Sequence, residues 1–294
     1  MASQQDIRRR IRSVQNTSKI TKAMELVAAA KLRRAQQRIE ALRPFADRME
    51  HLTIEAARRA HVHGEPLLQR REVNSVAILL VTGDRGLAGA FNSQIVRRGI
   101  QLQREYEAQG HKVTFLSVGR KGGGTLRFRQ MPIAREWQGF SDRPRYQDAE
   151  AIARHAAEIF AQGEVDLVVM VFNHFINALA QRVDVTELLP IPEDDVAEGE
   201  TPVERPKVEG DMLFEPDAQY MIGDLLRTGL EISVYRALLE STASEHGARM
   251  TAMGSASKNA GEVIDRLTLA MNRARQQEIT QAILEVVAGA DALE

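Results

Sequence analysis

Residues 83–92 are the segment of this sequence whose residue types and spacing most resemble a ligand-binding or catalytic site. They read GDRGLAGAFN and lie between an apolar run and a helical pattern. Backbone amides at a helix start bind phosphate, so a nucleotide-binding loop is one interpretation. However, the glycines lack the G-x-G-x-x-G spacing, and the segment lacks the Gly-Lys-Ser/Thr end of a P-loop. We therefore expect a structural strand-to-helix turn, whose residues are Gly83, Asp84, Arg85, Gly86 and Gly89.

The rest of the sequence offers little for catalysis or metal binding. It contains no cysteine, which excludes disulfides, thiol catalysis and cysteine-ligated metal sites. Its seven histidines are scattered. His174 follows an apolar run, where open α/β folds contact ligands, but a single histidine there is more often packed or hydrogen-bonded than catalytic. We predict no catalytic residue, no metal ligand and no cofactor, and we expect that the chain is not an enzyme by itself.

Charge is distributed unevenly along the chain, although the net charge is only −1. Residues 1–43 carry a net charge of +8 and residues 187–217 a net charge of −9. A basic helix binds nucleic acid, anionic lipid or an acidic protein surface, or is simply a solvated face. Nucleic acid is the weakest of the specific options, because residues 1–43 contain no aromatic side chain on which bases could stack.

Two very long helices must position these segments. All nine prolines lie between Pro44 and Pro216, and proline is the residue that most strongly interrupts a helix. We expect helices over residues 3–59 and 217–287, roughly 85 and 105 Å long. Both carry heptad spacing, which is typical of helices that wind around each other. The seam positions are Ile7, Ile11, Val14, Ser18, Thr21, Glu25, Ala28, Leu32, Ala35, Ile39, Leu42, Ala46 and Met49 at one end, and Met253, Ser257, Ala260, Ile264, Leu267, Met271 and Ala274 at the other.

The middle of the chain has a different pattern. Apolar, β-branched runs at 76–82, 112–118 and 166–172 predict strands that are buried on both faces, and the alternation at 181–191 predicts an edge strand. Helical patterns lie at 93–109 and 148–162, while Gly119 and the triple glycine 122–124 follow the second strand. Strands that alternate with helices indicate a mostly parallel sheet.

The predicted fold class is therefore α/β. A long antiparallel two-helix coiled coil from the N- and C-termini accompanies a central Rossmann-like α/β domain with a mostly parallel sheet. The expected divisions are a helix at 1–60, the α/β domain at 73–192, an acidic linker at 193–215 and a helix at 216–294.

Three segments carry a resemblance to a known family. They are IRRRIRSVQNTSKITKAMELVAAAK at 7–31, TGDRGLAGAFN at 82–92 and LAMNRARQQEITQAILEVVAGADA at 269–292. Together they resemble the gamma subunit of F-type ATP synthases, in the same order and over the whole chain.

The resemblance implies a rotor. In that family the coiled coil stands inside a ring of alternating alpha and beta subunits, and the α/β domain meets the epsilon subunit and the membrane c-ring. Proton flow turns the c-ring and the shaft, which drives each catalytic site through its conformations. The resemblance thus implies one copy of the chain in a hetero-oligomeric complex that transports hydrogen ions and makes ATP. It implies no nucleic acid among the binding partners.

The resemblance also implies site residues. It assigns contacts with a catalytic beta subunit to Arg275, Gln276 and Thr280, and it places Met24 across the coiled coil from them. The apolar segment 283–293 resembles the family's tip, which turns in an apolar sleeve. From the helix lengths we expect this end to extend roughly 20 Å or more beyond the N-terminal helix.

Two other classes of function remain open at this point. One is a coiled-coil protein that binds nucleic acid through its basic helix, and the other is a nucleotide-binding α/β enzyme that uses the glycine turn. The N-terminus is polar and basic without an apolar segment, so it does not predict a secretory signal. We expect a peripheral protein on the cytoplasmic face of a bacterial cell membrane.

Overall fold

The computed structural model describes residues 4–60, 65–192 and 218–291. Its contacts divide the chain into two compact units. We call Met1–Ala30 with Arg249–Glu294 the coiled-coil unit, and Lys31–Ala248 the sheet unit.

Two long helices contribute to both units, and their prediction is confirmed. Helix α1 is Gln4–Ala60, of 57 residues, and α5 is Ala218–Asp291, of 74 residues. Helix α1 continues through Pro44. The unit boundary crosses both helices, and the domain limits at residues 60, 73 and 216 stay a prediction. The predicted acidic linker 193–215 lies outside the described residues.

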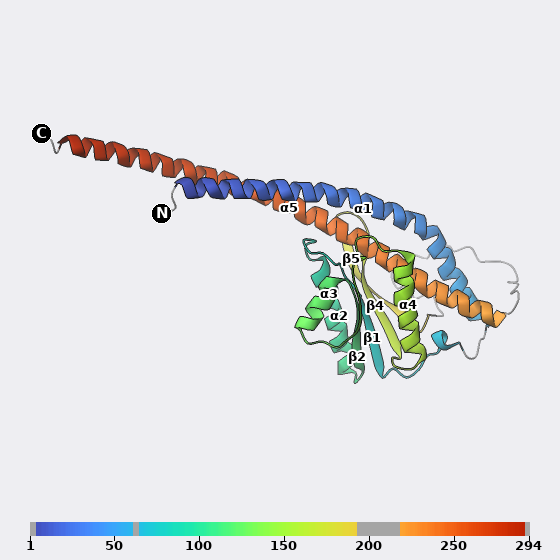
Figure 1. Ribbon diagram of the computed structural model, residues 1–294. Coiled ribbons are helices and arrows are strands. Elements are labelled where there is room, and N and C mark those ends of the chain that lie inside the picture. Colours follow the sequence, from blue (N-terminus) through green and yellow to red (C-terminus); the bar gives the residue numbers. More distant parts are fainter. Residues whose placement is uncertain (1–3, 61–64, 193–217, 292–294) are drawn as a thin grey trace. The chain divides into compact units, whose positions relative to one another are not determined.

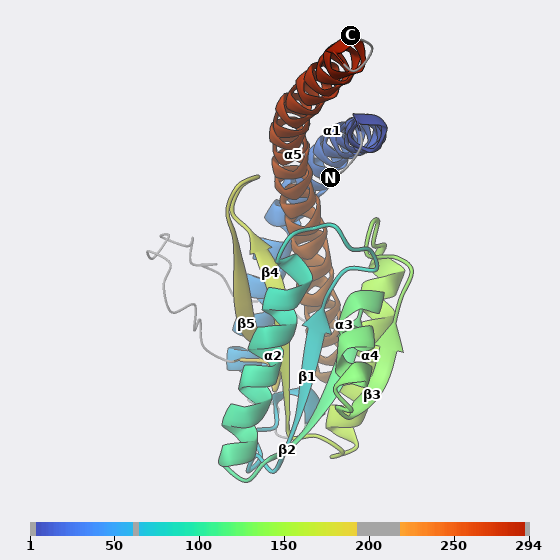
Figure 2. The same cartoon turned by 90° about the vertical axis from the view of Figure 1, so that its left-hand side faces the viewer.

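In the coiled-coil unit the two helices run antiparallel, side by side, along the predicted seams (Figures 1 and 2). Ile7, Ile11 and Ala28 of α1 are buried, as are Met253 and Ala260 of α5. A Cβ atom added to Gly254 would lie 3.4 Å from the Glu25 carboxylate, so these positions are level. The remaining predicted seam positions of this unit are buried or half-buried, so the heptads do mark the contact.

Helix α5 extends beyond α1 at the end of the coiled-coil unit (Figure 1). From the level shared by Glu25 and Gly254, α1 runs to Gln4 and α5 runs to Asp291. At 1.5 Å per residue, α5 is about 24 Å longer beyond this level. The expected overhang is therefore confirmed.

The sheet unit contains one five-stranded sheet, in the order β3-β2-β1-β4-β5. β1, β2, β3 and β4 are parallel, and β5 pairs with β4 antiparallel. This confirms the mostly parallel sheet. The strands are β1 Ser75–Val81, β2 Lys112–Val118, β3 Ile133–Trp137, β4 Leu167–Phe175 and β5 Gln181–Leu189.

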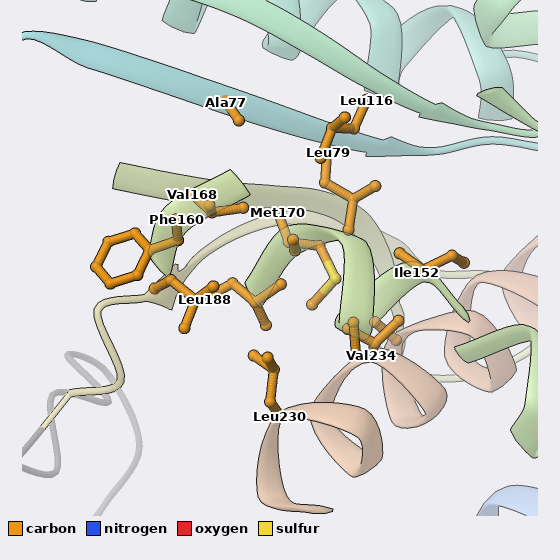
Figure 3. Close-up of a cluster of buried hydrophobic side chains, with 14 of the residues drawn as sticks. Ala77, Leu79, Leu116, Ile152, Phe160, Val168, Met170, Leu188, Leu230 and Val234 are labelled. Atoms are coloured by element: carbon orange, nitrogen blue, oxygen red, sulfur yellow. The ribbon is translucent and has the colours of Figure 1, made fainter. Parts of the chain in front are cut away.

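Helices cover both faces of this sheet (Figure 2). On one face α2 (Phe91–Ala108) and α3 (Arg120–Phe128) bury Val76, Ile78 and Leu80 of β1. On the other face α4 (Tyr146–Ala161) and the sheet-unit part of α5 bury the alternate residues. Figure 3 shows Leu230 and Val234 of α5 in this second cluster, near Met170 of β4. A short 3-10 helix, Pro66–Leu68, adds Leu67 to it.

Besides the 3-10 helix, the described residues form two elements that the sequence pattern does not indicate, α3 and β3. Helix α3 includes the triple glycine, although glycine disfavours helices by about 1 kcal/mol per residue. Close packing requires glycine at Gly122, whose neighbour is the buried Thr82, whereas the neighbour of Gly123 is the far end of a flexible glutamate side chain. A Cβ atom at Gly122 would lie 2.6 Å from Thr82 Oγ1, and one at Gly123 would lie 2.9 Å from the Glu136 carboxylate. Tertiary contact therefore overrides local propensity here.

None of the described helices is long and apolar enough to cross a membrane.

Candidate functional site

The glycine-containing turn lies at the carboxyl end of β1, and the carboxylate of its Asp84 accepts hydrogen bonds from three backbone amides of the chain itself. Asp84 Oδ1 accepts a hydrogen bond from Arg120 N at 3.0 Å. Asp84 Oδ2 accepts from Gly139 N at 2.9 Å and from Ser141 N at 3.1 Å, and Asp84 N donates to Ser141 Oγ at 2.8 Å. The turn thereby joins the starts of α3 and of the loop that follows β3.

These hydrogen bonds control the charge of Asp84. Burial acts to raise the pKa of this carboxyl, but the three backbone donors from Gly139, Ser141 and Arg120 outweigh it and lower the pKa below its ordinary value. Asp84 is therefore ionised at neutral pH and serves as a structural acceptor.

Among the described residues, the cavity at this edge of the sheet is too small for a nucleotide. A Cβ atom at Gly83 would lie 2.7 Å from the carboxylate of Glu245, which is itself buried. The cavity lined by Thr82, Phe91 and Glu245 has a volume of only about 10 Å3, enough for roughly one water molecule. Gly83 N donates to Asn92 Oδ1 at 2.8 Å, so it is not available for phosphate. The geometry does not favour the nucleotide-binding enzyme.

The other residues of the turn have modest roles. Gly89 has a φ of +56°, in the left-handed region that favours glycine. Gly86 has ordinary contact space beside Lys121, and Arg85 is exposed, with its carbonyl oxygen 3.4 Å from Asn92 Nδ2. Leu87 has a φ of +62° and is 62% exposed, and it adopts this left-handed conformation although it is uncommon for residues other than glycine.

His174 joins β4 to α5. Its Nδ1 lies 2.5 Å from Oε2 of the buried Glu240, whose Oε1 accepts from Arg236 Nε at 3.2 Å. The hydrogen bond to Glu240 raises the pKa of His174, while burial acts in the opposite direction. This histidine is packed and hydrogen-bonded, in keeping with the non-catalytic interpretation.

Among the described residues, no group of three or more His, Asp or Glu side chains is arranged to hold a metal ion.

Arg275, Gln276 and Thr280 lie together on α5 and all three are exposed. On an α-helix they fall within about 140° of each other. Their segment of α5 is level with the very start of α1, so they lie near the point where α5 becomes a single helix. The structure brings these three residues together on one side of α5.

Met24 does not lie opposite this group, so that expectation is wrong. Met24 is half-buried and is next to Glu25, which is level with Gly254. Arg275 lies about 31 Å farther along α5. The sequence motifs do not contain the pairing register between the two helices, and this is the reason for the error.

Beyond this polar group the overhanging end of α5 has an apolar character. Ile279, Ile283, Leu284 and Val286 are 53–73% exposed. Side chains of this size on a single helix leave an apolar surface that no other described residue of the chain covers, which is typical of a contact with another protein.

Most of the exposed charged side chains in the described coiled-coil part of α1 are basic. Arg8, Arg9, Arg10 and Arg12 are all exposed. Arg9 has a nearby acid, Asp6, at 3.7 Å. Exposed arginines of this kind provide long-range attraction to an acidic surface more than fixed contacts.

Sequence reasoning misses the polar contacts of the loop between β3 and α4. Asp142 in this loop accepts two hydrogen bonds from Lys31 Nζ of α1, at 2.7 and 2.6 Å. The partners are 111 residues apart, and no local pattern marks them.

Comparisons with known proteins identify one family, and the matches extend over nearly the whole chain. A model of the ATP synthase family matches residues 3–293. The ATP synthase gamma chain of Rubrobacter xylanophilus is 42% identical over 294 residues, which cover 100% of this chain and 99% of the relative. The ATP synthase gamma chain of Pelotomaculum thermopropionicum is 44% identical over 294 residues, and the match covers 100% of both chains.

Solved structures are similar as well. A chain from the central stalk and c-ring of the Tetrahymena thermophila mitochondrial ATP synthase has a TM-score of 0.60 at 29% identity, and the match covers 81% of this chain and 99% of that one. A chain from the rotor of the Euglena gracilis mitochondrial ATP synthase has a TM-score of 0.65 and covers 94% of this chain and 98% of its own length. At 20% identity the second likeness concerns the fold alone.

Proposed function

The chain belongs to the ATP synthase gamma chain family and is a central stalk subunit of that complex, and we propose a division of work between its two units. The coiled-coil unit turns inside a ring of alpha and beta subunits. The sheet unit binds the epsilon subunit and the membrane c-ring. One copy per complex couples proton-driven rotation to the conformational cycle of the catalytic sites.

The observation that carries this proposal is the asymmetry of the coiled-coil unit. It presents exposed arginines on α1, an exposed polar group around Arg275 on α5, and an apolar overhang of about 24 Å. A surrounding subunit meets a different face at each angle. A ligand shifts a conformational equilibrium only through unequal contacts with its states, and a shaft with unlike faces provides such inequality.

The chain itself supplies no catalytic group in this proposal. In the glycine turn, Asp84 is occupied by backbone amides of the same chain, and Gly83 N donates to Asn92. The proposed location is the cytoplasmic face of the cell membrane, where the chain is held as a peripheral subunit by its partners.

Arg275, Gln276 and Thr280 are the proposed contact with a catalytic beta subunit. They are exposed, share one side of α5 and lie at the level where the described part of α1 begins. Met24 is kept as a separate contact, about 31 Å away along the coiled coil.

Co-purification tests the proposal directly. A tagged copy of the full chain, expressed in its host and extracted from membranes in mild detergent, is expected to isolate a large ATPase containing alpha, beta, epsilon and c subunits. The purified chain alone is expected to hydrolyse no ATP above a heat-denatured control. Recovery of the tagged chain without these subunits, or turnover by the chain alone, would contradict the proposal.

A further inference from the structure

The loop between β3 and α4, residues 138–145, is held by hydrogen bonds to the turn after β1, to α4 and to both long helices. Its first contacts are with the turn after β1. Asp84 Oδ2 accepts from Gly139 N and Ser141 N, while Asp84 N donates to Ser141 Oγ. At its other end, Arg145 N donates to Asp148 Oδ2 in the first turn of α4 at 2.7 Å. The sheet and α4 therefore fix both ends of the loop.

The same loop also contacts both long helices within the sheet unit. The Thr242 hydroxyl of α5 lies 2.9 Å from Ser141 O, and it shares its proton with Leu238 O at 2.7 Å. From α1, Arg38 Nη2 donates to Pro144 O at 2.6 Å. Also from α1, Lys31 Nζ lies 2.7 and 2.6 Å from the two Asp142 oxygens.

The two helices are attached to the sheet by different kinds of contact. Helix α5 contributes Leu226, Leu230 and Val234 to the buried cluster on one face of the sheet, and Figure 3 labels the last two. Among the described residues, neither buried cluster of the sheet unit includes a residue of α1. Among the described residues, α1 contacts α5 within this unit, as in the pair Asp47–Arg236 at 3.3 Å, and it contacts the loop 138–145. The loop is thus a direct polar link from the sheet to α1.

The surroundings of Asp142 keep its carboxyl group charged beside Lys31. Burial acts to raise the pKa of Asp142, but the hydrogen bond and the charge of Lys31 outweigh it, and His246 and Arg85 lower the pKa further. His246 of α5 is buried, and its Nε2 lies 3.6 Å from Asp142 Oδ1. The side chains of Lys31 and Asp142 are 33% and 40% exposed, so water screens the pair only in part.

We propose that residues 138–145 form the coupling loop through which the sheet unit transmits torque to α1, with Lys31–Asp142 as its principal contact. This inference rests on the proposed central-stalk function. Lys31 and Asp142 are positioning residues, since they act through the helices and touch no substrate. The loop matters under load, because only then does the sheet unit have to drive α1 against resistance.

The test separates loaded from unloaded turnover in the complete ATP synthase. Lys31→Met removes the ion pair and keeps the length of the side chain. We expect unloaded ATP hydrolysis by the detached catalytic complex to stay near wild type. In membrane vesicles, proton-driven ATP synthesis should fall about two- to fivefold, the factor that corresponds to a partly exposed ion pair. Lys31→Arg keeps the charge and should restore synthesis.

A matched control is available in the sheet unit. Arg98 and Glu105 of α2 form an ion pair at 3.1 Å whose side chains are 33% and 45% exposed, close to the values for Lys31–Asp142. Arg98→Met should leave synthesis unchanged. Asp142→Asn preserves the shape of the loop and provides a second variant if Lys31→Met assembles poorly.

The outcomes are distinct. Equal synthesis in Lys31→Met and Arg98→Met would overturn the inference, as would a parallel loss of unloaded hydrolysis. Failure of Lys31→Arg to restore synthesis would also overturn it. If the wild-type chain itself failed to restore ATP synthesis to a strain that lacks it, the central-stalk function would fail instead.

Discussion

At the scale of single residues, the pair His174–Glu240 connects the sheet to α5 through a charge. Glu240 is 1% exposed and has His174 and Arg236 as partners. A buried carboxylate that loses a partner costs more than an exposed one, because its desolvation is no longer compensated. The position of His174 after a buried strand is visible in the sequence, but its partner is 66 residues away and no pattern identifies it.

This pair predicts a specific pH dependence of stability. The pKa of His174 is raised in the folded chain, so its contribution is fully present below its unfolded pKa of about 6.5 and is lost as pH rises through the folded pKa. His174→Gln should lower the free energy of unfolding by about 1–3 kcal/mol at pH 6, and by less at pH 8.5. Urea unfolding of both chains at several pH values measures this.

The wild-type and variant curves must converge as pH rises. A constant difference between them would show that the histidine acts through packing and not through its charge.

At the scale of elements, α3 shows how tertiary contacts use glycine. Gly122 packs where a Cβ would lie 2.6 Å from Thr82 Oγ1, whereas at Gly124 a Cβ would have no atom within 4 Å. The two residues are in the same helix and differ only in what surrounds them. Gly122 N also donates to Thr82 Oγ1 at 2.9 Å, which fixes the helix start on the sheet.

We therefore expect substitution by alanine to have opposite effects on stability at Gly122 and at Gly124. Gly124→Ala should stabilise the chain by about 0.5–1 kcal/mol, since alanine favours helix. Gly122→Ala should destabilise it by about 1–3 kcal/mol through overpacking. Thermal unfolding of both variants measures the difference. Stabilisation by both substitutions would mean that the contact with Thr82 relaxes at little cost.

Elements with strong local patterns could be predicted from the sequence, and elements defined by partners could not. The seams of α1 and α5 and the strands β1, β2, β4 and β5 carry clear periodicity or long apolar runs. Strand β3 is only five residues long, with Ala134 and Arg135 exposed, so neither signal is present. Helix α3 has a sequence that opposes helix formation and depends on its neighbours instead.

At the scale of the whole chain, spacing along each helix was predictable, but the register between the helices was not. The heptads identify which face of α1 and of α5 is buried, yet every shift by one heptad satisfies them equally. The contact between Glu25 and Gly254 selects one register. That register separates Met24 from Arg275 and confirms the overhang. The register also determines which exposed residues of α1 and α5 lie at the same level along the axis of the coiled coil.

The position of Arg275, Gln276 and Thr280 at the start of the overhang leads to the last prediction. Where α5 is paired with α1, it can resist a sideways push, while the unpaired overhang bends more easily. Contacts at the start of the overhang, where α1 still supports α5, can therefore transmit force. These residues are exposed in the chain, and a surrounding ring would shield them in part, which strengthens polar contacts, although desolvation limits the gain. Arg275→Ala combined with Gln276→Leu should therefore lower coupled ATP synthesis more than it lowers the yield of assembled complex.

Proton-driven synthesis and complex yield are measured side by side in membrane vesicles, with Arg266→Ala as the control. Arg266 lies about 180° around α5 from Arg275, and its nearby acid is Glu262 of the same helix at 3.7 Å. Arg266→Ala thus removes one positive charge, as Arg275→Ala does, but from the opposite side of α5. Wild-type synthesis in the double variant, or an equal loss in Arg266→Ala, would remove Arg275 and Gln276 from the mechanism. The overall charge of α5 and its apolar overhang would then be the features that drive the catalytic sites.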